Sequence, residues 1–331
     1  MFNFIYLLKL LATALITNSH YSAIWPVSAL ATGGLLGNVI FFAVSGFCLC
    51  RIKDGFVKWY GKRFLRIYPV MALFTLLTVV IGKYSITNLN GFIELFLFPT
   101  NYIFIVWILL LYVPFYVVSY ADEKHDGVIK WTLTATVSLW LIVYMIFVDK
   151  SHYHIDDVNS PFILFLYFAS MLIGALFNKN RKKFTQLKIK NFIFVLTSLV
   201  MYFGAKIIFS RYSRVSFLQP INQIAIIAAL ISIFAFAIGL EKILCKLNGK
   251  VIYVMKFIAS ITLQIYIVQF LVIESFKSLV FPLNLVVVTA LIVISASILY
   301  YIEHYVRKGI GYIVNKNKTK NGDPYAENEN K

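Results

Sequence analysis

Residues 220–240 read PINQIAIIAALISIFAFAIGL, a run of 21 positions without a charged side chain. A helix of about 20 mainly apolar residues is long enough to cross the hydrocarbon core of a bilayer. The run therefore predicts a transmembrane helix, and the expected fold is an all-α integral membrane protein. Similar runs predict a bundle of about ten such helices, near residues 4–23, 34–50, 67–83, 93–119, 131–148, 161–177, 191–209, 220–240, 257–275 and 283–303.

The composition of the chain also indicates a lipid environment. Of 331 residues, 60% are hydrophobic and only 14% are charged, so a water-soluble globule could not cover its apolar surface. The net charge of +17 would suit a nucleic-acid partner in a soluble protein. Here the basic residues lie between apolar runs, which indicates membrane lipids as partners and no nucleic acid.

Lysine and arginine gather in alternate loops, and such loops are typically cytoplasmic. With an even number of spans, both termini are then predicted in the cytoplasm, in a multi-pass protein of the inner (plasma) membrane. The first stretch, 4–23, lacks a small-residue cleavage site and is expected to stay as a helix. The basic loops contain Arg51, Lys53, Lys58, Lys62, Arg63 and Arg66, then Lys179, Arg181, Lys182, Lys183, Lys188 and Lys190, then Lys242, Lys246, Lys250 and Lys256.

The chain is predicted to form one membrane domain, residues 1–310, followed by a short tail. Residues 311–331 are basic and polar with few apolar side chains, so this cytoplasmic tail is expected to be disordered. The stretch 93–119 is interrupted by Pro99 and Pro114, which predicts a broken helix or a re-entrant piece there.

The outer end of the first predicted span is polar, and it contains His20 after Thr17, Asn18 and Ser19. A neutral imidazole can take a proton from a hydroxyl near pH 7. Lys9 precedes His20 by eleven residues, so the two share a helix face about 16 Å apart. The alternatives are a histidine that caps the helix at the interface and a lysine that reaches the headgroups.

Two further patterns follow in the chain. Residues 33–47 place glycines and Ser45 near a helix start, which favours close helix packing or a path for a thin substrate. Arg63 and Arg66 lie three positions apart before Pro69, so they project from one side of a helix. Paired guanidinium groups bind phosphates well, although basic residues also anchor a helix on the cytoplasmic side.

In this order, the features resemble the bacterial membrane acyltransferase-3 family. In the family's first helix a basic residue, more often arginine, is usually separated from a histidine by ten positions. Lys9 and His20 have this spacing here. Glu303 resembles the glutamate of the family's closing element. Trp107 stands alone where many members have Trp-x-x-x-Glu, and Gln269 replaces a frequent histidine. The resemblance rests on Lys9, His20, the stretch 41–47, Arg63-x-x-Arg66-x-x-Pro69 and Tyr301-Ile302-Glu303-His304.

The resemblance implies an O-acyltransferase that moves an acyl group, expected to be acetyl, from a cytoplasmic acyl-CoA to a hydroxyl of an extracytoplasmic or lipid-linked polysaccharide. Acetyl-CoA would be the donor, the glycan the acceptor, and no metal would be needed. Lys9, Arg63 and Arg66 would hold the CoA phosphates. His20 would be the general base or a transient acyl carrier. Residues expected at the substrate are Asn18, Ser45, Gln269 and Glu303.

Three other interpretations stay open at the level of sequence. A transporter or flippase for a lipid-linked saccharide would use the same apolar helices, and a helical scaffold would need none of the polar residues. Within the enzyme hypothesis, Ser19 could be a nucleophile with His20 as its base, but adjacent helical residues point about 100° apart. The outer loop at 149–157 contains aspartates and histidines, yet it lacks a recognisable metal-ligand spacing.

Overall fold

The computed structural model describes residues 2–97 and 102–320, with side chains as far as residue 308. In this part of the chain every regular element is helical. Short 3₁₀ turns occur at Tyr21–Ala23, Ser28–Leu30, Arg181–Phe184 and Ser213–Leu218, and a π-helical turn at Ile93–Leu97. The α-helices are α1 (Asn3–Ser19), α2 (Gly34–Leu49), α3 (Phe56–Val80), α4 (Leu89–Phe92), α5 (Ile103–Lys124), α6 (Val128–Phe147), α7 (Ile163–Asn180), α8 (Ile189–Arg211), α9 (Pro220–Leu244), α10 (Gly249–Ser260), α11 (Thr262–Phe276) and α12 (Leu283–Lys320).

The all-α membrane bundle is confirmed. In the described part of the chain, eight helices are long and apolar enough to cross a membrane, or up to nine if the bent pair α10 and α11 forms one span. Helix α1, with 17 residues, is shorter than these spans. The predicted number of ten and the side of the membrane on which the termini lie stay predictions.

Two predicted spans differ from the structure. Helix α3 begins at Phe56 and not at 67, because a helix can continue beyond the bilayer with basic side chains in water. The span expected at 257–275 is instead bent by 67° between α10 and α11. The stretch 93–119 is divided, as expected, between the π-helical turn Ile93–Leu97 and α5, which begins at Ile103. Pro114 lies inside α5 without ending it, and Pro99 lies outside the described residues.

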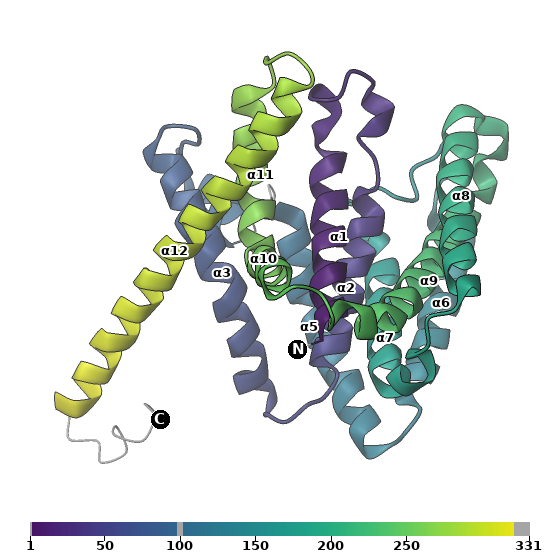
Figure 1. Cartoon of the computed structure of the whole chain (residues 1–331), viewed down its shortest axis with the longest axis horizontal. Coiled ribbons are helices and arrows are strands. Elements are labelled where there is room, and N and C mark those ends of the chain that lie inside the picture. Colours follow the sequence, from purple (N-terminus) through teal and green to yellow (C-terminus); the bar gives the residue numbers. More distant parts are fainter. Residues whose placement is uncertain (1, 98–101, 321–331) are drawn as a thin grey trace.

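The last helix is longer than expected. Helix α12 continues to Lys320, so residues 311–320 are helical although a disordered tail was expected from 311. Lysine is a good helix former, which allows a polar extension of an apolar helix. The remaining residues of the tail lie outside the described residues. In Figure 1 the C-terminal half of α12 extends away from the bundle.

Helix α1 lies between two groups of helices, as Figure 1 shows. One hydrophobic core joins residues of α1 to α2, α5, α7 and α9. A second core joins α3, α11 and α12. Helix α1 also packs on α10 and α11. Residues along α1 are therefore placed where the two groups meet.

Helices α2 and α7 cross in very close contact through two glycines. A Cβ atom on Gly46 would lie 1.9 Å from the carbonyl oxygen of Met171, and one on Gly174 would lie 1.9 Å from that of Ala43. Small residues allow helix backbones to approach in this way. The packing role predicted for the small residues near Ser45 is thus confirmed for Gly46.

Candidate functional site

A cavity of about 440 Å³ opens at the end of α1 that bears His20. Its walls come from the ends of α1 and α2, from α5, α8 and α11, and from the loop after α6. Gly33 and Gly34 line it, and both also lie close to side chains of α1. The path for a thin substrate stays a prediction. The volume lies within the range of small-molecule sites.

His20 follows the last turn of α1 and lines this cavity. Its backbone N–H donates to the carbonyl of Thr17 at 3.1 Å. Its ring lies edge-on to Phe270 of α11, with ring centroids 4.6 Å apart. The hydroxyl of Ser19 donates to the carbonyl of Ile16 at 2.7 Å. Ser19 is therefore bonded to its own helix and not to the imidazole of His20.

Asn18 holds the loop that follows α1. Its Nδ2 donates to the carbonyls of Leu30 and Thr32 at 2.8 and 3.0 Å. Its Oδ1 accepts from Trp25 Nε1 at 2.9 Å. The amide of Asn18 thus fixes the loop that closes one side of the cavity, and the substrate contact expected of it stays a prediction.

The wall of the large cavity also carries an ion pair, which the sequence analysis missed. Lys206 Nζ of α8 contacts Asp156 Oδ2 of the loop after α6, and both residues line the cavity. Trp107 Nε1 donates to the carbonyl of Val158 at 2.9 Å, which ties the same loop to α5. The available signal was Lys206 itself, because a charge inside the predicted span 191–209 marks a functional candidate.

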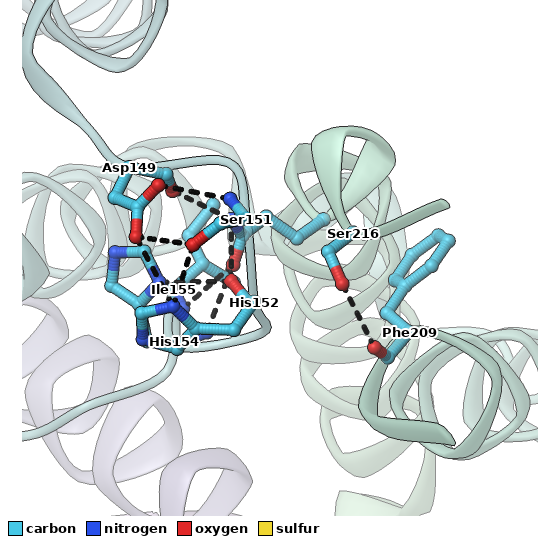
Figure 2. Close-up of polar contacts among 8 residues, drawn as sticks. Asp149, Ser151, His152, His154, Ile155, Phe209 and Ser216 are labelled. Atoms are coloured by element: carbon cyan, nitrogen blue, oxygen red, sulfur yellow. Dashed lines mark hydrogen bonds and ion pairs between the residues drawn. The ribbon is translucent and has the colours of Figure 1, made fainter. Parts of the chain in front are cut away.

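The loop after α6 is held in place by hydrogen bonds (Figure 2). Gln219 Oε1 accepts from the backbone N–H groups of His154 and Ile155 at 3.0 Å each. Hydrogen bonds from Ser151 hold the pKa of the Asp149 carboxyl below its usual value. Within the described residues no group of three or more His, Cys, Asp or Glu side chains is arranged to hold a metal ion. The loop is thus built by hydrogen bonds, and its Asp156 faces the cavity.

A much smaller cavity, about 20 Å³, lies next to the large one along α1. Phe104 and Tyr266 line both, so the two adjoin. Gln269 of α11 lines the small cavity and is fully buried. Its Oε1 accepts from Thr17 Oγ1 at 2.8 Å, whereas its Nε2 has no partner. An unsatisfied buried N–H is costly, so it points to a ligand atom at this place.

The basic residues gather toward the start of α1. Lys9 is half-buried and lies near enough to Arg66 and Cys48 for their side chains to interact electrostatically. The guanidinium of Arg63 stacks over Trp59 at 4.3 Å, and its Nη1 donates to the Trp59 carbonyl at 2.7 Å. Lys9 therefore lies within electrostatic range of Arg66, whereas Arg63 is partly engaged by Trp59.

Two other predicted residues lie on this side of the bundle. Ser45 of α2 is half-buried and faces the hydroxyl of Tyr112, which also interacts with Arg63 and Arg66. Ser45 is therefore grouped with the basic residues. Neither it nor Glu303 lines the cavity of His20.

Glu303 links three helices close to the basic residues. Its Oε2 accepts from Gln264 Nε2 of α11 at 2.9 Å, and its Oε1 pairs with Arg307. Arg307 in turn donates to the backbone carbonyl of Arg66 at 3.1 Å. The geometry thus places Glu303 in a contact between α11, α12 and α3, and its role at the substrate stays a prediction.

A family model described as an acyltransferase domain, that of the acyltransferase-3 family, matches residues 2–304. The chain belongs to this family. No curated protein and no solved structure matches it. It is thus a multi-pass membrane acyltransferase, and the transporter interpretation is not favoured.

Proposed function

We propose that this membrane acyltransferase transfers an acetyl group from acetyl-CoA in the cytoplasm to a hydroxyl of an extracytoplasmic or lipid-linked polysaccharide. The inner membrane is then its location. The observation that carries the proposal is the order of features along α1. Lys9 lies near its start, Thr13 and Thr17 line the small cavity, and His20 lines the large one.

The donor is proposed to bind at the basic end. Lys9 and Arg66 would hold the anionic phosphates of CoA, with Arg63 contributing the donors that Trp59 leaves free. The thin pantetheine arm would extend along α1 through the small cavity. This direction brings the thioester toward His20, about 16 Å from Lys9 along the helix.

The chemistry is proposed to occur where the two cavities meet. His20 takes the proton from the acceptor hydroxyl, and the oxygen attacks the thioester carbonyl. The carbon–sulfur bond then breaks, and the proton passes from His20 to the departing sulfur of CoA. The products are an O-acetyl ester and free CoA, so no metal or redox partner is required. The proton that His20 takes from the hydroxyl thus ends on the sulfur of CoA, and the imidazole is neutral again at the end of the reaction.

Gln269 is proposed to bind the donor, not the acceptor. Its partnerless Nε2 is a hydrogen-bond donor in the narrow part of the path. The pantetheine arm carries amide carbonyls, and its thioester carbonyl gains negative charge during attack. A donor held in a buried site stabilises such charge without rearranging. The amide therefore suits either the arm or the reacting carbonyl.

The test is mass spectrometry of surface glycans from a deletion strain complemented with wild type, His20→Ala or His125→Ala. His125 follows α5, is exposed, and serves as the matched control. Acetyl mass units should disappear in the deletion and return with wild type and His125→Ala only. Glycans that are equally acetylated but retained inside the cell would contradict the proposal and favour transport.

A further inference from the structure

The large cavity beside His20 contains a salt bridge that the proposed transfer of the acetyl group does not use. The side chain of Asp156 is 14% exposed and that of Lys206 is 36% exposed. An ammonium has three donors and a carboxylate about four acceptor sites, so each keeps capacity beyond the other. The pair therefore presents both donors and acceptors to the cavity.

The charges of the cavity wall cancel. Among the residues that the structure describes, Asp156 and Lys206 are the Asp, Glu, Lys or Arg residues of this wall, and they carry opposite charges. The other polar residues of the wall include the amides of Asn38 and Asn159 and the hydroxyl of Thr32. A ligand with its own net charge would find no unmatched partner here, and its desolvation would be costly.

Aromatic side chains complete the wall. Trp107 and Tyr266 line the cavity, together with Phe270 beside His20. Flat apolar faces combined with paired donors and acceptors suit a molecule with hydroxyl groups on its rim and C–H bonds on its faces. A sugar ring has this form.

We propose that this cavity is the acceptor subsite and that it takes a neutral sugar residue, in preference to a uronic acid or a phosphate-bearing sugar. Asp156 accepts hydrogen bonds from sugar hydroxyls, and Lys206 donates to a sugar oxygen. An added anionic group would meet the Asp156 carboxylate and remain without a free cation. This inference rests on the proposed function, because it assigns the acceptor of that same reaction.

The first experiment locates the acetyl groups. Tandem mass spectrometry of surface glycans from the deletion strain, with and without the full chain, shows on which sugar the chain-dependent acetyl lies. We expect neutral sugars. Acetyl on uronic acids or phosphate-bearing sugars overturns the inference while leaving the acyltransferase intact. If no acetyl group depends on the chain, the proposed function fails, and the inference fails with it.

The second experiment tests the two residues with Asp156→Asn and Lys206→Met. Each should reduce glycan acetylation at least about tenfold, because a site built for hydroxyl groups loses partners. Binding of acetyl-CoA to the purified full chain in nanodiscs should keep the wild-type Kd, because neither residue lies among the basic residues near Lys9. Lys277→Met is the matched control, because Lys277 pairs with Glu274 outside this cavity, and it should keep wild-type acetylation.

The outcomes separate binding from folding. Full glycan acetylation with either variant overturns the inference, as does an equal loss of acetyl-CoA binding. If the variants do not fold, as judged by size-exclusion chromatography, Lys206→Arg keeps the positive charge. It should then retain acetylation on neutral sugars, and its loss of acetylation in a folded protein counts against the inference.

Discussion

Replacing Gln269 with leucine separates a binding role from a structural one. The substitution keeps the approximate size of the side chain but removes an amide whose Oε1 accepts from Thr17 and whose Nε2 has no partner. Gln264 provides the matched control. It lies on the same helix, it is buried, and its Nε2 bonds the carboxylate of Glu303 while its Oε1 has no partner.

The two variants are expected to differ in stability. Loss of the bond from Thr17 costs about 0.5–1.5 kcal/mol, and removal of a partnerless buried amide nitrogen gains about 1–3 kcal/mol. Gln269→Leu should therefore lie between about 0.5 kcal/mol less stable and about 2.5 kcal/mol more stable than wild type. Gln264→Leu also removes a partnerless atom, but it loses a bond to a charged acceptor, worth about 1.5–3 kcal/mol, so it should be less stable than Gln269→Leu.

The assay combines thermal unfolding with enzyme kinetics. Unfolding of the purified protein in detergent is followed by tryptophan fluorescence, and release of CoA from acetyl-CoA gives KM and kcat. Gln269→Leu should raise KM for acetyl-CoA or lower kcat about tenfold, because one lost hydrogen bond of about 1.4 kcal/mol changes an equilibrium tenfold. The donor-binding role would be refuted if Gln269→Leu were less stable than Gln264→Leu and its KM and kcat were unchanged.

Three further substitutions test other contacts. Arg66→Ala should raise KM for acetyl-CoA about tenfold through a lost phosphate contact, measured by release of CoA. Arg214 is exposed after α8, so Arg214→Ala should leave KM unchanged in the same assay. Glu303→Gln should lower the midpoint of thermal unfolding, because it weakens a charged contact between α11 and α12 worth about 1–3 kcal/mol. Gly46→Leu should prevent folding, since its Cβ would lie 1.9 Å from a backbone oxygen. Gly204→Leu, whose Cβ meets nothing within 4 Å, should fold normally by size-exclusion chromatography.

The contradicting outcomes are equally specific. An unchanged KM with Arg66→Ala would move the phosphate site away from α3. An unchanged unfolding midpoint with Glu303→Gln would mean that the charge of Glu303, which contacts Gln264 and the exposed Arg307, contributes no net stability. Correct folding of Gly46→Leu would mean that α2 and α7 can separate, and it would contradict the close crossing described above.

The apolar runs predicted the helices well because hydrophobicity and length decide which segments cross a bilayer. They could not predict the start of α3 at Phe56, because a helix that leaves the membrane continues through basic residues that lower the local hydropathy. Nor did they predict the bend between α10 and α11. Residues 257–275 contain no proline, so nothing in the pattern marked the break at Ile261.

The candidate site was predicted in part. The spacing of Lys9 and His20 correctly placed the two residues about three turns apart along one helix, since helical periodicity is a local property. Their roles stay predictions. The pairing of Asp156 with Lys206 depends on how a loop folds back onto α8, which no local pattern encodes. Lys206 was nevertheless visible as a charge within an apolar run, and Asp156 was visible only as one aspartate among several.

Two of the helices that line the small cavity, α1 and α11, are short. Helix α1 has 17 residues and α11 has 15, which correspond to about 26 and 23 Å of helix. A typical hydrocarbon core is about 30 Å thick. A bilayer around this part of the protein must thin, or water must enter from both sides, to match these lengths. In either case the thioester of the proposed donor would have less than a full membrane to cross. Lipid composition, through bilayer thickness, then becomes a factor in the rate of transfer.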